Sequence, residues 1–165
     1  MNIYTIEKFK EIELRDTKKS DLERLFIIQL DEEANFLAAF TPKLPTNKEQ
    51  YLTKWIRLLR DSTVIIKTII VNNQIVGSVA KYEMEGNAEI TYWIDKEYWG
   101  MGITTMALEK FLKVENIRPI YGRVAFDNLG SQRILEKCKF EKIRTEKGFA
   151  NARGKEIEEF IYKLN

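Results

Sequence analysis

Three β-rich segments in the middle of the chain constrain its fold most, because almost nothing separates them. They cover residues 62–71, 75–84 and 88–95, and only the short polar stretches "NNQ" and "EGN" lie between them. Connections this short join neighbouring antiparallel strands, so the sequence predicts a meander. A helical pattern begins directly after Gly102, and another β-branched segment, "IYGRVAF", follows it. A strand reached through a helix is expected to run parallel to the strand before that helix.

The two ends of the chain are predicted to complete a mixed sheet. A short strand is expected at residues 11–16, and two more strands at about 141–147 and 157–164. The sequence therefore predicts an α/β (α+β) fold, with a mostly antiparallel central sheet of about six to seven strands flanked by about four helices.

Helices are predicted where apolar residues recur at helical spacing. The first two are expected to begin at capping-box patterns, Ser20 with Glu23 and Thr46 with Glu49, and the segment "FTPKLP" separates them. A third helix follows Gly102, and a short fourth one covers "DNLGSQRILEKC".

The composition excludes several classes of protein. With 165 residues and a net charge of +2, the chain is expected to form a single domain over residues 1–165 without an electrostatic affinity for nucleic acid or membranes. It contains no histidine, so Ser-His-Asp and Cys-His catalysis and imidazole zinc sites are excluded, and no metal is expected. The sequence shows neither a signal peptide nor an apolar run of about 18 residues, which favours a cytoplasmic location.

Gly100 and Gly102 stand where a predicted strand passes into a helix, in the stretch "YWIDKEYWGMGITTMALEKFL". Unpaired N–H groups at a helix N-terminus bind phosphate readily, and glycines let the backbone approach such a ligand. The hydroxyl groups of Thr104 and Thr105 would add donors. The structural alternative is that the two glycines only make a tight turn. A P-loop is excluded because "GMGITT" lacks lysine, and a dinucleotide fingerprint is excluded because Thr105 stands where a third glycine belongs.

The segment "WGMGIT", Trp99 to Thr104, resembles motif A of the GNAT acetyltransferase superfamily. Gly102 matches the first required glycine of that motif. Trp99 replaces the usual Arg or Gln, as in the branch that resembles RimJ and RimL, and Thr104 replaces Gly or Ala.

A second stretch, "RVAFDNLGSQRILEKCKF", resembles the same branch. Lys139 stands where the family usually has glycine. The positions that match are Asn128, Ser131, Leu135, Glu136, Lys137 and Phe140.

The resemblance implies acetyl-coenzyme A as co-substrate, with no metal. Backbone N–H groups from Gly100 to Thr105 would hold its pyrophosphate. Peptide groups near Trp93 and Ile94 would pair with the pantetheine arm, and one N–H there would polarise the thioester carbonyl. Asn128 would contact the pantetheine or cap the following helix. The residues expected to bind the cofactor are Trp93, Ile94, Trp99, Gly100, Met101, Gly102, Ile103, Thr104, Thr105 and Asn128.

Acyl transfer to an amine needs a base, because a protonated amine cannot attack. Glu89, at the start of the central strand, is the first choice for this base. The structural alternative is that Glu89 is only a solvated charge at the end of a strand. Many family members use a tyrosine as general acid where this chain has Leu135. Ser131 is expected to stand in for it, unless it is only a small helix residue. Cys138 is expected to be a small core residue rather than a nucleophile.

The acceptor is predicted to be a primary amine, of a small molecule or of a protein N-terminus. Its pocket would lie between the two N-terminal helices and the loop around "FLAAFTPKLPT". The alternatives are a catalytically weak domain that binds coenzyme A as a sensor or scaffold, and a module that binds nucleotide phosphates. Formation of a homodimer is left open.

Overall fold

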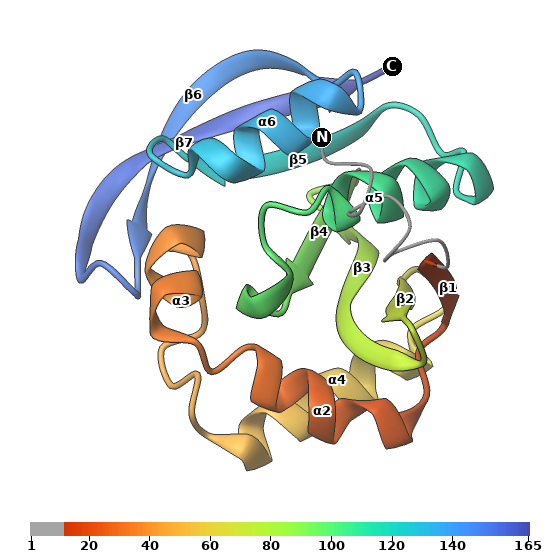
Figure 1. Ribbon diagram of the computed structural model, residues 1–165. Helices are drawn as coiled ribbons and strands as arrows, with labels where there is room; N and C mark the ends of the chain where they lie inside the picture. The colour runs from red at the N-terminus through yellow and green to blue at the C-terminus, as the bar shows by residue number, and fades with distance from the viewer. Residues whose placement is uncertain (1–11) are drawn as a thin grey trace.

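The computed structural model describes residues 12–165, and its strands form a single sheet of seven strands (Figure 1). The order of the strands across the sheet is β1-β2-β3-β4-β5-β7-β6. The strands are β1 (Ile12–Asp16), β2 (Ile65–Val71), β3 (Gln74–Met84), β4 (Asn87–Ile94), β5 (Ile120–Ala125), β6 (Glu141–Ala150) and β7 (Lys155–Leu164).

Five α-helices and two short 3-10 turns complete the described part of the chain. No helix among these residues is long and apolar enough to cross a membrane. The helices are α2 (Leu22–Ile28), α3 (Glu32–Ala38), α4 (Lys48–Arg60), α5 (Ile103–Val114) and α6 (Leu129–Lys137), and the turns cover Lys19–Asp21 and Lys96–Tyr98.

The predicted topology and fold class are confirmed. β2, β3 and β4 form an antiparallel meander, and β5, reached through α5, pairs parallel to β4. The other neighbouring strands are antiparallel. The strand expected at residues 11–16 begins at Ile12, while residue 11 lies outside the described residues. That residues 1–165 make up one domain remains a prediction.

The two faces of the sheet are covered by different helices. The main core lies between the sheet and the helices α5 and α6, and it contains Ile90 of β4 with Leu108 and Phe111 of α5. Trp93, three residues after Ile90, points to the opposite face, because side chains alternate along a strand. There it packs against the pair formed by α2 and α4, together with Trp55. The two helix pairs lie at opposite ends of the view in Figure 1.

The capping box expected at Ser20 is wrong. Helix α2 follows the short turn at Lys19–Asp21, and the Asp21 carboxylate accepts a hydrogen bond from the Lys18 N–H at 2.8 Å. The same carboxylate accepts two bonds from the Arg15 guanidinium, at 2.6 and 2.8 Å. Because Asp21 is only 3% exposed, these donors offset the cost of burying its charge. Asp21, rather than Ser20, therefore organises the start of α2.

Two further helix starts differ from the prediction. Asn47, rather than Thr46, caps α4 by accepting a bond from the Gln50 N–H at 3.0 Å. Helix α3 was not predicted at all. It begins at Asp31, whose side chain accepts a bond from the Ala34 N–H at 2.8 Å. Neighbouring polar residues are equally able to cap a helix, and a seven-residue helix is too short for a clear apolar period.

Gly77 of β3 allows the backbone of β4 to come unusually close. A Cβ atom at this position would lie 2.1 Å from the carbonyl oxygen of Trp93 and 3.0 Å from the Cα of Ile94. Both contacts are with backbone, so neither can be relieved by a side-chain rotation.

We expect Gly77→Ala to lower the free energy of unfolding by about 1 to 3 kcal/mol, because β4 must move to admit the methyl group. Urea denaturation measures this change. Gly148→Ala is the matched control, since its Cβ would meet only a side-chain atom of Phe40, at 3.3 Å. An equal loss of stability in the two variants would contradict the close approach of β3 and β4.

Candidate functional site

β4 and β5 pair only at one end and then separate. Their register runs from Ala88 opposite Ile120 to Ile90 opposite Gly122, a span of three residue pairs. β4 continues to Ile94 on the other side of this point, where its partner in the register is β3 alone. The edge of β4 from Thr91 to Ile94 therefore faces an opening in the sheet, with peptide groups available to a ligand.

An open cleft with a volume of about 1720 Å³ passes through this opening. On one side it reaches the start of α5 and of α6, and on the other it extends between the sheet and the N-terminal helices. The predicted acceptor region lies in this second part, since Phe40, Thr41 and Leu44 line it. Among the predicted site residues, those that line the cleft are Trp93, Ile94, Trp99, Gly100, Thr104, Asn128 and Ser131.

The glycine loop has the backbone geometry of a ligand-binding helix start. Gly100 and Gly102 have φ angles of +73° and +76°, which residues with a Cβ atom rarely adopt. Apart from the glycine itself and its two neighbours in the chain, no atom of the described residues lies within 4 Å of the position of a Cβ at either glycine. In α5 the Met106 N–H donates to the Gly102 carbonyl. The N–H groups of residues 103–105 precede this bond, so they are available to an anion.

Two tryptophans hold the loop and the strand edge in place. The Trp99 indole Nε1–H donates to the Ile94 carbonyl at 3.2 Å, which ties the loop to the end of β4. Trp93 packs against α2 and α4, and its Nε1–H is buried without a hydrogen-bond partner among the residues described. The side chains of Ile103 and Met101 contribute to the core, so any ligand contact from them would come from their backbone.

Asn128 caps α6, so the capping role, one of the two roles predicted for it, is confirmed. Its side-chain oxygen accepts a bond from the Ser131 N–H at 3.3 Å. A contact between Asn128 and the pantetheine remains a prediction.

The Ser131 hydroxyl lies 2.7 Å from the hydroxyl of Tyr92, which the sequence analysis had not singled out. Both side chains line the cleft. Burial raises the pKa of Tyr92, so this phenol stays protonated and can donate to the serine oxygen. Leu135, at the family's usual tyrosine position, is buried in the core instead. Alternation along β4, which points Tyr92 to the same face as Ile90, was a signal for this contact.

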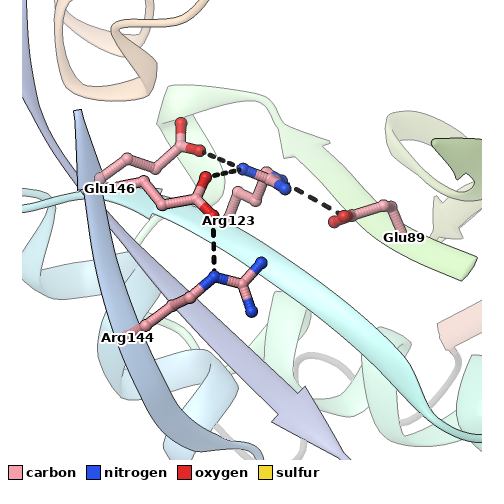
Figure 2. Close-up of polar contacts among 5 residues, drawn as sticks. Glu89, Arg123, Arg144 and Glu146 are labelled. Carbon is pink, nitrogen blue, oxygen red and sulfur yellow. Dashed lines mark hydrogen bonds and ion pairs between the residues drawn. The ribbon is translucent and has the colours of Figure 1, made fainter. Parts of the chain in front are cut away.

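Glu89 is not a solvated strand-end charge, so that alternative is wrong. It is 2% exposed, and its Oε1 accepts a hydrogen bond from the Arg123 Nε–H at 3.2 Å (Figure 2). The Arg123 Nη1 donates to Glu146 at 2.9 Å and to Glu159 at 3.0 Å, and Arg144 donates to Glu146 at 2.7 Å. We call these five residues the charge cluster.

The surroundings of Glu89 favour its protonated form. Burial raises the pKa of Glu89, and although the Arg123 guanidinium opposes this, the pKa stays above its usual value. The other carboxylate oxygen, Oε2, is buried and has no hydrogen-bond partner among the described residues. A carboxylate with a raised pKa is a better proton acceptor once it is ionised. Neither Arg123 nor Glu159 was predicted from the sequence, although the charge of Arg123 within the apolar segment "IYGRVAF" was a signal for it.

Cys138 is a core residue, as predicted. It is 6% exposed, and its Sγ lies 3.8 Å from the carbonyl oxygen of Thr105. Burial raises the pKa of its thiol to about 11, so the reactive thiolate is rare at neutral pH.

Comparison with known proteins agrees with this architecture. Residues 11–141 match the family model described as "Acetyltransferase (GNAT) domain". The "Putative ribosomal N-acetyltransferase YdaF" of Bacillus subtilis (strain 168) is 28% identical over 118 residues, which is 67% of this chain. The match covers 64% of the length of that relative, a little under two thirds.

Two solved structures share the fold. The RimL acetyltransferase of ribosomal L7/L12, in complex with coenzyme A, superposes with a TM-score of 0.81 at 20% identity, over 93% of both chains. The microcin C7 self-immunity acetyltransferase MccE, in complex with acetyl-CoA and AMP, gives a TM-score of 0.78 at 21% identity, over 93% of this chain and 92% of that one. At these identities the likeness concerns the fold. Because the family model spans most of the chain, the protein belongs to the GNAT acetyltransferase domain family.

Proposed function

We propose that this chain is an acetyl-coenzyme A-dependent N-acetyltransferase that moves an acetyl group from sulfur to a primary amine by direct attack. The observation that carries the proposal is the opening between β4 and β5, which adjoins the free N–H groups at the start of α5. Membership of the family supports it, and so do the complexes of RimL with coenzyme A and of MccE with acetyl-CoA.

The residues around the opening fit acetyl-coenzyme A. The space beside Gly100 and Gly102 is open, and the N–H groups of residues 100–105 would bind the pyrophosphate there. The exposed edge of β4 at Trp93 and Ile94 would pair with the pantetheine arm. The loop residues proposed to hold the cofactor are Trp99, Gly100, Met101, Gly102, Ile103, Thr104 and Thr105.

In the proposed reaction the cofactor supplies the thioester that is attacked. Glu89 accepts the proton that leaves the amine, through a water molecule, because Glu89 is not among the residues that line the cleft. A backbone N–H near Trp93 or Ile94 donates to the developing oxyanion. The Ser131 hydroxyl would donate to the departing thiolate. In that arrangement Tyr92 would donate the 2.7 Å bond between the two hydroxyls, which either oxygen could donate, and so keep Ser131 oriented.

Ser131→Ala is expected to lower kcat by about 3- to 10-fold, the value of one neutral hydrogen bond. Tyr92→Phe should lower it by a similar or smaller factor. Because the two hydroxyls act in series, the double variant should lose little more than Ser131→Ala alone. Steady-state rates at saturating acetyl-coenzyme A measure all three, and losses that multiply would mean that Tyr92 does not act through Ser131.

The function itself is tested by the release of free thiol from acetyl-coenzyme A in the presence of candidate amines. The panel contains spermidine, free amino acids and peptides with a free N-terminus. We expect release with at least one of them. Stabilisation by coenzyme A with no release would favour the alternative of a sensor or scaffold, which the leucine at position 135 also favours. An acceptor on the ribosome, as the name of YdaF suggests for that protein, would place this chain in the cytoplasm.

A further inference from the structure

The charge cluster reaches the wall of the cleft through two of its members. Arg123 and Glu159 line the cleft beside Tyr82, whereas Glu89 and Glu146 are not among its lining residues. The Glu159 side chain is 12% exposed, and it comes from β7, on the face of the sheet that the acceptor region occupies. Glu146 lies opposite Glu159 on the neighbouring edge strand β6, where its side chain is 41% exposed and accepts a bond from Arg144. Among the carboxylates of the charge cluster, the one that a molecule in the cleft meets is therefore that of Glu159.

When Glu89 is ionised, as its proposed role as proton acceptor requires, the charge cluster has one positive charge fewer than it has negative charges. The guanidinium groups of Arg123 and Arg144 face the carboxylates of Glu89, Glu146 and Glu159. The Oε2 of Glu89 has no partner among the described residues, but Glu89 does not line the cleft, so a cation in the cleft reaches the cluster at Glu159. A cation bound there lowers the cost of holding the three carboxylates together.

We propose that Glu159 binds the amine acceptor in its cationic, ammonium form. Arg123 is the positioning residue, because its guanidinium donates hydrogen bonds to both Glu159 and Glu89. This inference rests on the proposed function and names the substrate class of the same site. Alkyl amines are mostly protonated at neutral pH, so the acceptor arrives with the missing positive charge. Glu159 then contributes to acceptor binding, whereas Glu89, which lies deeper, accepts the proton.

The geometry separates the two glutamates in a way that kinetics can detect. Loss of a contact made with the ground-state ammonium raises KM for the acceptor, whereas loss of the proton acceptor lowers kcat. Glu159→Gln should therefore raise KM for the acceptor by about 10-fold or more, the value of a charged hydrogen bond, and leave KM for acetyl-coenzyme A unchanged. Glu158→Gln is the matched control. It removes a carboxylate from the same strand, β7, that is exposed and does not line the cleft, and we expect its KM values to stay within about threefold of the wild type.

Direct binding separates this inference from the proposed function. The protein is saturated with coenzyme A and titrated by calorimetry with spermidine, with an alanine tripeptide amide, and with the same tripeptide acetylated at its N-terminus. We expect at least one of the free amines to bind and the acetylated peptide not to bind. Glu159→Gln should weaken the amine by about 10-fold or more, and Glu159→Asp, which keeps the charge, should lie between the two. The melting temperature and the coenzyme A response of each variant show whether it is folded.

Three outcomes overturn the inference: neither free amine binds to the wild type, Glu159→Gln binds as tightly as the wild type, or Glu158→Gln weakens binding equally. Binding that depends on Glu159 in a protein that transfers no acetyl group would support the inference and contradict the proposed function. Acetyl transfer with unchanged acceptor affinity in Glu159→Gln would do the reverse.

Discussion

Gly102→Val is expected to abolish the stabilisation of this protein by coenzyme A. Gly102 is the N-cap residue directly before α5, with a φ of +76°, and the place that a Cβ would occupy is open. A valine side chain there would project into the space proposed for the pyrophosphate. Because valine also resists a positive φ, the backbone of the loop would shift and its N–H groups would no longer converge on an anion.

The effect is large enough to measure by thermal unfolding. A ligand at 100 times its Kd stabilises the native state by about 2.7 kcal/mol, which for a chain of this size raises Tm by about 5 to 10 °C. The wild type should show this shift and Gly102→Val should not. Gly86→Val is the matched control. Its φ is +80° and its Cβ position is also open, but it lies at the opposite end of β4. It should lose intrinsic stability from the same strain and keep the response to coenzyme A. Equal responses in Gly102→Val and the wild type would contradict the assignment of the loop.

Much of the fold could be predicted because its signals are local. The short turns at 72–73 and 85–86 leave β2, β3 and β4 no arrangement but a meander, and the helix after Gly102 makes β5 parallel. The starts of the helices could not be predicted in the same way. Asp21 resembles an ordinary first-turn acid until the fold brings Arg15 and Thr68 to its carboxylate.

The candidate site likewise has one part that the sequence predicts and one part that it does not. The glycine loop is contiguous in sequence, and the structure places it at a helix start as predicted. The charge cluster joins Glu89 to Arg123, 34 residues later, and Arg123 to Glu159, another 36 residues on. These contacts depend on the register of β4, β5 and β7, which no local pattern specifies. For the same reason, Glu89 could be chosen as a base from the sequence, but neither its burial nor its partner could be foreseen.

Glu89→Gln is expected to lower kcat/KM by about 10²- to 10⁴-fold, the usual contribution of a general base. Glutamine has nearly the same shape, and its side-chain oxygen can still accept the bond from Arg123, so the charge cluster should keep its geometry. The stabilisation by coenzyme A should therefore be unchanged. In the wild type, activity should rise with pH as Glu89 loses its proton, with a midpoint above the usual value for a glutamate because its pKa is raised.

Stability provides a second readout that does not depend on the acceptor. Because burial raises the pKa of Glu89 in the folded state, the protonated form is favoured by folding. This contribution is fully present below the pKa of the unfolded chain and is lost as the pH rises through the raised pKa of the native state. Glu89→Gln cannot ionise, so its free energy of unfolding should lack that decline, as urea titrations at a series of pH values would show. If the decline disappears while kcat/KM stays near the wild-type value, Glu89 is a buried structural carboxylate. The base would then be another group or a water chain, and positioning of the amine by β4 and the glycine loop would supply most of the rate enhancement.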